Sequence, residues 1–252
     1  MHGSRSFSFI RSARHGIWRR VSRSLVWLGC LAGCDAADEP ATGEGSGPPP
    51  TPWSGCAVPC VEDFDAGVPG FGRCVANFDP AQSTAAAGGY GHEDAHLRAS
   101  GAPGGREDVV SLGCGGSIVV DLGPAGAVDG PGADLIVFEN PFSLEFPEAG
   151  QVSVSEDGCV WAAFDCDPVT LSGCAGVTPT LATPGSELDA RQPETAGGDA
   201  FDLADVGLTQ VRFVRIEDQS APYWMEVGGD WCDPGVGGKG GFDLDAIAVV
   251  HD

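Results

Sequence analysis

The sequence predicts an all-β sandwich, and two observations support this fold class. Short runs rich in Val, Ile and Phe recur after residue 115, and Gly, Pro, Asn or Asp bounds each of them. Between them, no segment repeats apolar residues at helical spacing over more than about three turns. The strand-like runs cover residues 117–122, 133–138, 151–155, 210–216 and 242–250. Several short strands joined by Gly- and Pro-rich loops are typical of sandwiches.

A hairpin turn is predicted at residues 156–158, where the sequence Glu-Asp-Gly interrupts two apolar runs. Gly at the second central position tolerates positive φ, so the turn would close a hairpin from Val154 to Trp161. We expect Trp161 to lie in the core, with a ligand platform as the alternative.

The N-terminal segment has the composition of a bacterial lipoprotein signal. Six arginines and no acidic residue stand in residues 1–23, and the short apolar run at residues 24–32 is too short to span a bilayer. It ends in Leu-Ala-Gly-Cys, which resembles a lipobox, so Cys34 is the predicted lipidation site; bulky residues before Cys30 make it the poorer one. The alternatives are an ordinary signal peptide with a chance cysteine and an unstructured basic start.

The domain organisation follows from this signal. Residues 1–33 are the predicted signal peptide, and residues 34–55, rich in Gly, Ser, Thr and Pro, form a lipidated flexible tether. Residues 56–252 are the right length for a single β-sandwich domain.

The charge of the chain after Cys34 is strongly negative. All 36 acidic residues but only 7 of the 13 basic residues follow that position, which gives a formal charge of −29. This balance argues against nucleic acid as a partner, since binding phosphates needs clustered Lys and Arg. It favours solubility and cation binding, and the solubility role alone is an alternative to any specific cation site.

Cysteine content indicates an oxidising compartment. Eight cysteines remain after the signal and the lipidation site, and an even number in an exported chain is typical of disulfides. We expect Cys166 to pair with Cys174, because a turn-like segment separates them. Zinc is disfavoured, because Cys56 and Cys60 have no second pair at the spacing of a zinc finger. The predicted disulfide cysteines are Cys56, Cys60, Cys74, Cys114, Cys159, Cys166, Cys174 and Cys232.

Two resemblances refine the fold. Residues 119–123, 152–161, 211–216 and 241–247 carry a DLG segment, an SxDGxxW hairpin and a closing strand with alternating Asp, which resemble discoidin-type, galactose-binding-like jelly rolls. The segments at 109–113, 115–119, 134–140 and 196–205 resemble a family of uncharacterised, myxobacterial-type cell-surface proteins, over roughly residues 85–252. The resemblance implies a jelly-roll β-sandwich and cell-surface location, without an established activity. Cys114 and Cys159 depart from the apolar residues expected there, and we expect them to form an extra bridge.

A zinc metalloprotease is one enzymatic alternative, because residues 92–96 match H-E-x-x-H. The glycines on both sides leave about two helical turns at most, without an apolar face, and no third ligand is indicated. A glycosidase using paired carboxylates is the other alternative, although 36 acidic residues make chance pairs common. No G-x-S-x-G motif supports a serine nucleophile after the signal.

Calcium is the expected metal. Two loops are dense in aspartate, whose oxygens are hard ligands, and we expect one structural Ca²⁺. Neither loop has the EF-hand pattern, and the alternative is that these residues cap turns through the backbone. The candidate ligands are Asp129, Asp134, Asp199, Asp202 and Asp205.

The predicted ligand surface is the loop at residues 219–241. It places Tyr223, Trp224 and Trp231 among glycines, and sugar rings stack on such aromatic side chains. Burial of these rings against the sheet is the alternative.

These observations predict an exported, lipid-anchored, non-catalytic binding or surface module whose partner is a glycan or a surface protein; a purely structural role is a third alternative. The expected location is the outer membrane or cell surface, although Asp35 after Cys34 would retain a lipoprotein at the inner membrane under enterobacterial sorting rules.

Overall fold

Two antiparallel sheets face each other in the computed structural model, which describes residues 55–60, 68–81, 99, 101–104, 108–139, 146–228 and 241–252. Cys34, Trp231, Cys232 and the H-E-x-x-H segment lie outside the described residues. Residues 47–252 group into one compact unit. No described helix is long and apolar enough to cross a membrane.

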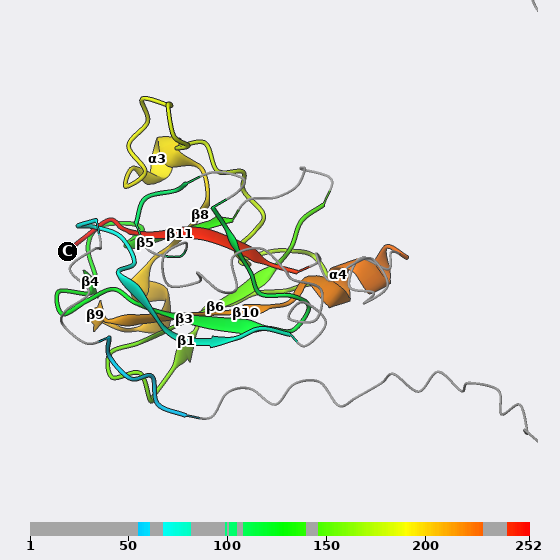
Figure 1. Cartoon of the computed structure of the whole chain (residues 1–252), viewed down its shortest axis with the longest axis horizontal. Helices are drawn as coiled ribbons and strands as arrows, with labels where there is room; N and C mark the ends of the chain where they lie inside the picture. The colour runs from blue at the N-terminus through cyan, green and yellow to red at the C-terminus, as the bar shows by residue number, and fades with distance from the viewer. Residues whose placement is uncertain are drawn as a thin grey trace, which may run out of the picture. The chain divides into compact units, whose positions relative to one another are not determined.

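The first sheet has five strands in the order β1-β3-β10-β6-β7. Its strands are β1 (Cys74–Asp79), β3 (Ser117–Asp121), β10 (Phe213–Asp218), β6 (Gly150–Ser155) and β7 (Ala162–Ala163). The second sheet has the order β2-β11-β5-β8. Its strands are β2 (Val110–Ser111), β11 (Asp243–Val249), β5 (Leu135–Glu139) and β8 (Asp199–Phe201). Figure 1 shows β5 and β11 in the upper layer and β1, β3 and β10 in the lower layer.

A small third sheet and three short helical segments complete the described elements. β4 (Ala127–Val128) pairs with β9 (Gln210–Val211). The helical segments are α3 (Pro193–Ala196), the 3₁₀ turn η1 (Leu203–Val206) and α4 (Ser220–Glu226). The prediction of an all-β sandwich is therefore confirmed. The run predicted at 210–216 is divided at Arg212 between β9 and β10.

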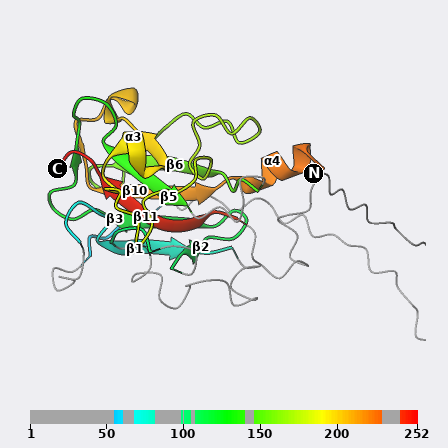
Figure 2. The same ribbon diagram turned by 90° about the horizontal axis from the view of Figure 1, so that it is seen from above.

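The core lies between the two large sheets because side chains alternate along each strand. In β5, Leu135 and Val137 face this core, where residues from β3, β6, β10 and β11 meet them. Ile136 and Phe138 face the opposite side, where they pack with Ala196 of α3. Figure 2 looks down on this outer face, with α3 in front of β5. Each face of the second sheet is thus covered by apolar residues.

The predicted hairpin joins β6 to β7, with Val154 opposite Ala162. Gly158 adopts a φ of 75°, which L side chains rarely adopt. The expectation that Trp161 lies in the core is met only in part. Trp161 is half-buried and packs against a small apolar cluster on the outer face of the first sheet, and the Arg215 guanidinium carbon lies 4.8 Å from its ring centroid. Trp161 precedes Ala162, the first residue of β7, so it lies just outside the paired part of the strand.

Three disulfides join described residues. They are Cys56–Cys159, Cys60–Cys74 and Cys166–Cys174, and the last is the pair that the spacing favoured. The expected Cys114–Cys159 bridge is wrong, because the Ala57 amide donates to the Gly158 carbonyl (2.8 Å) and so places Cys56 beside Cys159. Cys114 is also disulfide-bonded.

Candidate functional site

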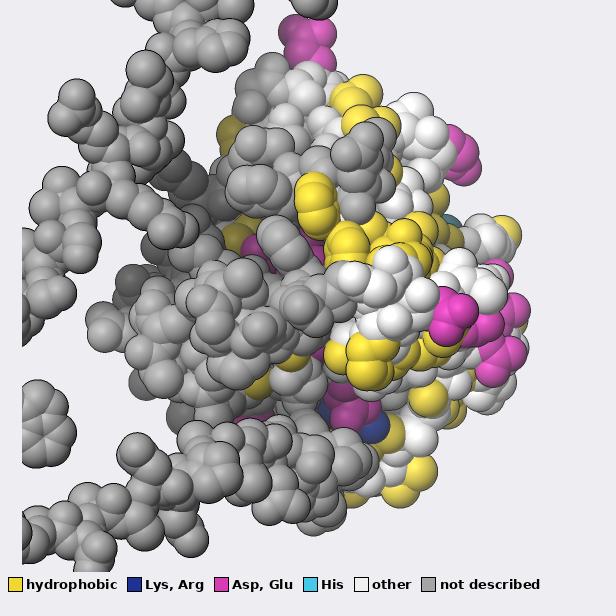
Figure 3. Space-filling view, turned by 90° about the vertical axis from the view of Figure 1, so that its right-hand side faces the viewer, with side chains coloured by type: hydrophobic (Ala, Val, Ile, Leu, Met, Phe, Trp, Pro, Cys, Tyr) yellow, Lys and Arg dark blue, Asp and Glu magenta, His cyan; other side chains and the backbone are white. Residues whose placement is uncertain are grey.

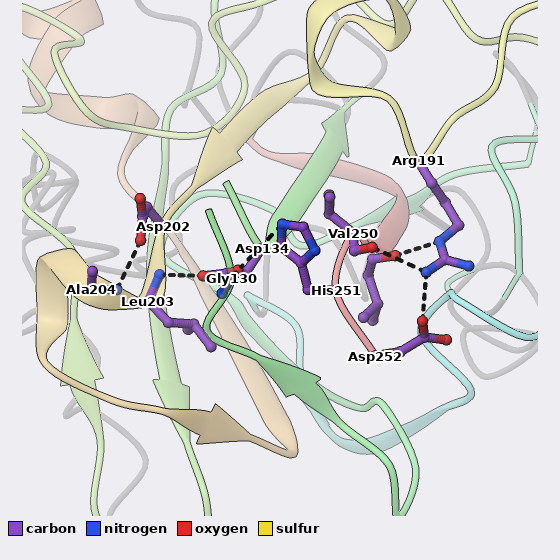
Figure 4. Close-up of polar contacts among 10 residues, drawn as sticks. Gly130, Asp134, Arg191, Asp202, Leu203, Ala204, Val250, His251 and Asp252 are labelled. Atoms are coloured by element: carbon purple, nitrogen blue, oxygen red, sulfur yellow. Dashed lines mark hydrogen bonds and ion pairs between the residues drawn. The ribbon is translucent and has the colours of Figure 1, made fainter. Parts of the chain in front are cut away.

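Three of the five predicted calcium ligands meet at one end of β5. Oxygens of Asp129, Asp134 and Asp202 lie within 4.8 Å of one another. An ion with ligand distances of about 2.3–2.6 Å fits between oxygens at this separation. We call these residues the aspartate trio; Figure 4 shows Asp134 and Asp202 with their contacts.

Hydrogen bonds from backbone amides hold two of the three carboxylates of the aspartate trio in place. The buried Asp134 carboxylate accepts from the Gly130 and Leu203 amides, both at 2.8 Å. Asp202 is the N-cap of η1 and accepts from the Ala204 amide at 2.9 Å. These bonds also match the alternative that the aspartates fasten turns, because Asp134 and Asp202 each have a structural role without an ion.

A histidine and an arginine lie beside the aspartate trio. His251 Nε2 is 4.0 Å from an Asp134 oxygen, so a protonated His251 would attract the carboxylate that an ion also attracts. Arg191 donates to the carbonyls of Val249 and Val250 and pairs with Asp252 at 2.9 Å (Figure 4). Arg191 thereby holds the end of β11 and the residues that follow it, which include His251.

The other two predicted ligands, Asp199 and Asp205, line a separate open cavity of about 720 Å³. The cavity lies at the sandwich edge where β7 ends the first sheet and β8 ends the second. We call it the edge cavity. The expectation that all five aspartates share one ion is therefore not met by the described geometry, because only the aspartate trio converges.

Carboxylates and aromatic rings share the lining of the edge cavity. Asp165 joins Asp199 and Asp205, and the buried Phe164 and Phe201 rings lie 4.9 Å apart. The Cys166–Cys174 disulfide anchors the loop at its rim. Acceptors and apolar surface therefore face the same space.

Asp199 has a perturbed acidity. Burial raises the pKa of its carboxyl, and hydrogen bonds from the amides of Val177 (3.0 Å) and Thr178 (3.2 Å) partly offset that rise. A carboxyl with a raised pKa can act as a proton donor as well as a hydrogen-bond acceptor.

The predicted aromatic ligand residues are divided between described and undescribed segments. Tyr223 and Trp224 lie in α4, and Trp224 is only 8% exposed. The Trp224 ring stacks on Phe146 at 5.4 Å and meets Tyr223 edge-on at 5.2 Å. This burial argues against Trp224 as a stacking platform, because ring packing occupies the faces that a sugar would need.

Helix α4 exposes apolar side chains instead. Met225 is 71% exposed and Val227, just after the helix, is 55% exposed. Figure 3 views the side of the molecule on which α4 lies and shows hydrophobic and acidic side chains together at the surface. Exposed residues of this kind are common singly and do not define a binding surface by themselves.

Sequence reasoning missed the buried acidic residues at the other end of the sandwich. Glu139, Glu148 and Asp218 are each less than 5% exposed. Asp218 accepts from the Gly115 amide, the Phe242 amide (both 2.8 Å) and the Ser220 hydroxyl (2.5 Å). The only sequence signal was the position of Glu139 and Asp218 at the ends of strand-like runs, where turn residues are equally common.

No protein-family model matches this chain, and no curated protein matches it.

Proposed function

We propose that the chain is an exported, lipid-anchored, non-catalytic binding module whose ligand occupies the edge cavity. The observation that carries this proposal is the cavity of about 720 Å³, lined by three carboxylates and by apolar side chains that include the exposed Val177. Concave sites of this size, with apolar walls and a few polar groups, are the usual form of small-ligand sites. The residues that line this cavity lie on loops and edge strands, where a rigid scaffold commonly positions binding residues.

A glycan is the ligand class that we propose. Sugar hydroxyl groups donate hydrogen bonds to carboxylates such as Asp165 and Asp205, and the C–H faces of sugar rings pack against apolar surface. The described residues that line the edge cavity include no Lys or Arg, which disfavours an acidic sugar and favours a neutral or amino sugar. The alternative partner is a surface protein that inserts a Lys side chain or a polar loop into the edge cavity.

Export is supported by residues distributed along the chain. The three described disulfides span separations of 8 to 103 residues, and such bonds persist in oxidising compartments. The lipobox-like segment supplies the anchor at Cys34. The jelly-roll, galactose-binding-like topology and the cell-surface family remain part of this proposal, because they rest on the sequence resemblance.

A structural Ca²⁺ in the aspartate trio is a second part of the proposal. Its support is the convergence of three carboxylates within 4.8 Å on two loops that are distant in sequence. Bound there, an ion would join the loop before β5 to the start of η1, and it would neutralise part of the acidic surface.

An exported glycosidase is the alternative function that one observation favours. Asp199, whose pKa is raised, shares the edge cavity with Asp165 and Asp205, and glycoside hydrolysis uses one protonated and one ionised carboxyl. The metalloprotease alternative depends on residues 92–96, outside the described residues.

A glycan array probed with the protein lacking residues 1–34 tests the binding proposal. We expect binding without turnover, and loss of at least about tenfold in affinity when Asp165 and Asp205 are both replaced by Asn. The matched control is Asp79→Asn, an exposed aspartate at the end of β1. Hydrolysis of a bound glycan would favour the glycosidase, and unchanged binding by the double variant would move the ligand out of the edge cavity.

Membrane fractionation tests the anchor. The full chain should sediment with the outer membrane, and Cys34→Ser should release it or leave it unprocessed. Recovery of the wild-type chain only with the inner membrane would contradict the surface location.

A further inference from the structure

A second open cavity, of about 470 Å³, lies where the residues that follow β11 pass the segment before α3. Its walls come from three stretches that are far apart in sequence: the loop before β5, residues 189–194, and Val250 with His251. It shares no lining residue with the edge cavity. We call it the arginine cavity, because Arg191 lines it and no Lys or Arg lines the edge cavity among the described residues.

The backbone holds the Arg191 guanidinium group in one position. Its Nε atom donates to the Val249 carbonyl at 2.6 Å, and Nη2 donates to the Val250 carbonyl at 3.2 Å and pairs with Asp252 at 2.9 Å. The side chain also passes close to Gly70, where a Cβ atom would approach it to 2.8 Å. No described residue accepts a hydrogen bond from the remaining nitrogen, Nη1 (Figure 4). Its two N–H groups are therefore available to a ligand.

His251 adds a second basic side chain to the arginine cavity. Its carbonyl accepts from the Val128 amide at 3.0 Å, and its Nε2 atom lies 4.0 Å from an Asp134 oxygen. The imidazole ring lies against Gly130, where a Cβ atom would collide with it. Because these contacts hold His251 as the carbonyls hold Arg191, a ligand binds without the entropic cost of ordering two mobile side chains.

Two exposed acids, Asp189 and Glu194, line the same cavity. One Asp189 oxygen accepts from the Arg191 amide at 2.9 Å, which fastens the turn before α3. The Glu194 carboxylate has no hydrogen bond or ion pair with a described residue, so it can accept hydrogen bonds from a ligand. The arginine cavity thus presents both signs of charge, whereas the charged residues that line the edge cavity are all acidic.

We propose that the arginine cavity binds a small zwitterion with a carboxylate and an ammonium group, as in a free amino acid or a short peptide. The Arg191 guanidinium group binds the carboxylate, because a planar guanidinium matches carboxylate geometry. The ammonium group donates to Glu194. A simple anion is repelled by Asp189 and Glu194, and a simple cation is repelled by Arg191. A volume of about 470 Å³ lies within the usual range for small-ligand sites.

This site is a second binding site, beyond the ligand of the edge cavity. Its residues differ from those of the edge cavity, so loss of glycan binding leaves the proposal intact. His251 also lies beside Asp134 of the aspartate trio, so the experiments are done in EGTA to keep calcium out of the comparison.

Calorimetric titration of the detergent-solubilised full chain with the standard L-amino acids and with glycylglycine tests the proposal. We expect at least one of them to bind with one site per chain, and the stronger binder identifies a free amino acid or a peptide as the ligand. The N-acetyl and amide derivatives of that compound each lack one charge, and both should bind at least about tenfold more weakly. Absence of binding by every compound would overturn the proposal, as would equal binding by the two derivatives.

Variants place the ligand in the arginine cavity. Arg191→Gln and Glu194→Gln should each weaken binding at least about tenfold, whereas Glu187→Gln, at an exposed glutamate that lines neither cavity, should leave it unchanged. Glu194→Gln should not weaken binding of the N-acetyl derivative further, because that compound has no ammonium group; a merely structural role of Glu194 would affect both compounds.

Two results would move the ligand out of the arginine cavity and overturn the proposal. One is unchanged affinity in Arg191→Gln and Glu194→Gln, and the other is loss of binding in the Asp165→Asn/Asp205→Asn double variant, which alters only the edge cavity. If Arg191→Gln does not fold, Glu194→Gln decides alone, because its side chain is exposed and makes no described contact that the fold needs.

Discussion

Asp121 and Arg212 form a bidentate ion pair on the outer face of the first sheet. Arg212 donates through Nε at 2.9 Å and through a terminal nitrogen at 2.8 Å, one to each carboxylate oxygen. The Asp121 carboxylate also accepts hydrogen bonds from the backbone amides of Cys60 (3.0 Å) and Gly123 (2.8 Å). Burial alone would raise the pKa of Asp121, but these hydrogen bonds lower it overall. The Asp121 carboxylate thus links β3 to Arg212, the residue just before β10, and to Cys60, which is disulfide-bonded to Cys74.

Asp121→Ala should strongly destabilise the domain. Asp121 is 1% exposed, so the substitution removes the buried acceptor of two Arg212 hydrogen bonds and of the Cys60 and Gly123 amides. Breaking a buried pair in this way typically costs about 3–5 kcal/mol. Urea unfolding at neutral pH, followed by tryptophan fluorescence, measures the change.

The matched control is Asp252→Ala, which removes a second Arg–Asp pair. The arginine side chains of the two pairs are equally accessible, at 29% each, but the Asp252 side chain is 47% accessible and the Asp121 side chain only 1%. Exposed pairs contribute about 0–1 kcal/mol, so the control should change the free energy of unfolding far less. Equal losses in the two variants would show that burial does not set the strength of the Asp121–Arg212 pair.

Removing a disulfide should destabilise the domain more when the loop that it closes is longer. Cys56–Cys159 spans 103 residues and Cys166–Cys174 spans 8. The loop-closure entropy model gives about 5 kcal/mol for the first and about 2.5 kcal/mol for the second. Paired Cys→Ser substitutions compared by denaturant unfolding measure both, and a larger loss for the short loop would contradict an entropic origin.

The sequence could predict the fold class because strand alternation is a local property. The runs at 117–122 and 151–155 correspond closely to β3 and β6, where apolar residues alternate or cluster over five or six positions. The pairing of Cys56 with Cys159 could not be predicted, because it depends on where a segment some hundred residues away packs. Cysteine spacing specifies pairs only when the two cysteines share a turn, as Cys166 and Cys174 do.

The candidate sites show the same limit. Aspartate density suggested one ion site, but Asp199 faces the edge cavity while Asp202, three residues later, caps η1. Strand alternation and the turn between them separate two residues that look equivalent in sequence. Glu139 could not be identified either, since its unsatisfied carboxylate results from the packing of other strands around it.

Stability should decrease between about pH 4 and pH 7 because of Asp243. Burial raises the pKa of this carboxyl to about 7, despite its hydrogen bond with the Ser111 hydroxyl, and repulsion from Asp218 contributes. Between about 3.8 and 7 the native state keeps a proton that the unfolded state has released, so raising the pH favours unfolding. The loss across this window is of the order of 4 kcal/mol. Urea unfolding from pH 4 to pH 8 in EGTA measures it.

Asp243→Asn should flatten this pH profile and stabilise the protein above pH 7, because the amide does not ionise and can still bond to Ser111. Asp79→Asn, at an exposed position, should keep the wild-type slope. A wild-type profile that rises from pH 4 to pH 7 would contradict the raised pKa of Asp243 as the dominant contribution.

Calcium should stabilise the domain through the aspartate trio, and Asp129→Asn with Asp202→Asn should remove that contribution. Asn at position 202 still caps η1, because Asn and Asp are similar N-caps, and Asp129 is exposed, so neither change should unfold the domain. Asp134 is a poor choice for substitution, since its loss would also free the Gly130 and Leu203 amides. At a hundredfold excess of calcium over Kd, the trio should contribute about 2.7 kcal/mol, or about 5–10 °C in the melting midpoint. Melts of the wild-type chain and of the double variant, each with calcium and with EGTA, measure this contribution, and a calcium-induced shift that is equal in the two proteins would show that the aspartates only fasten their turns.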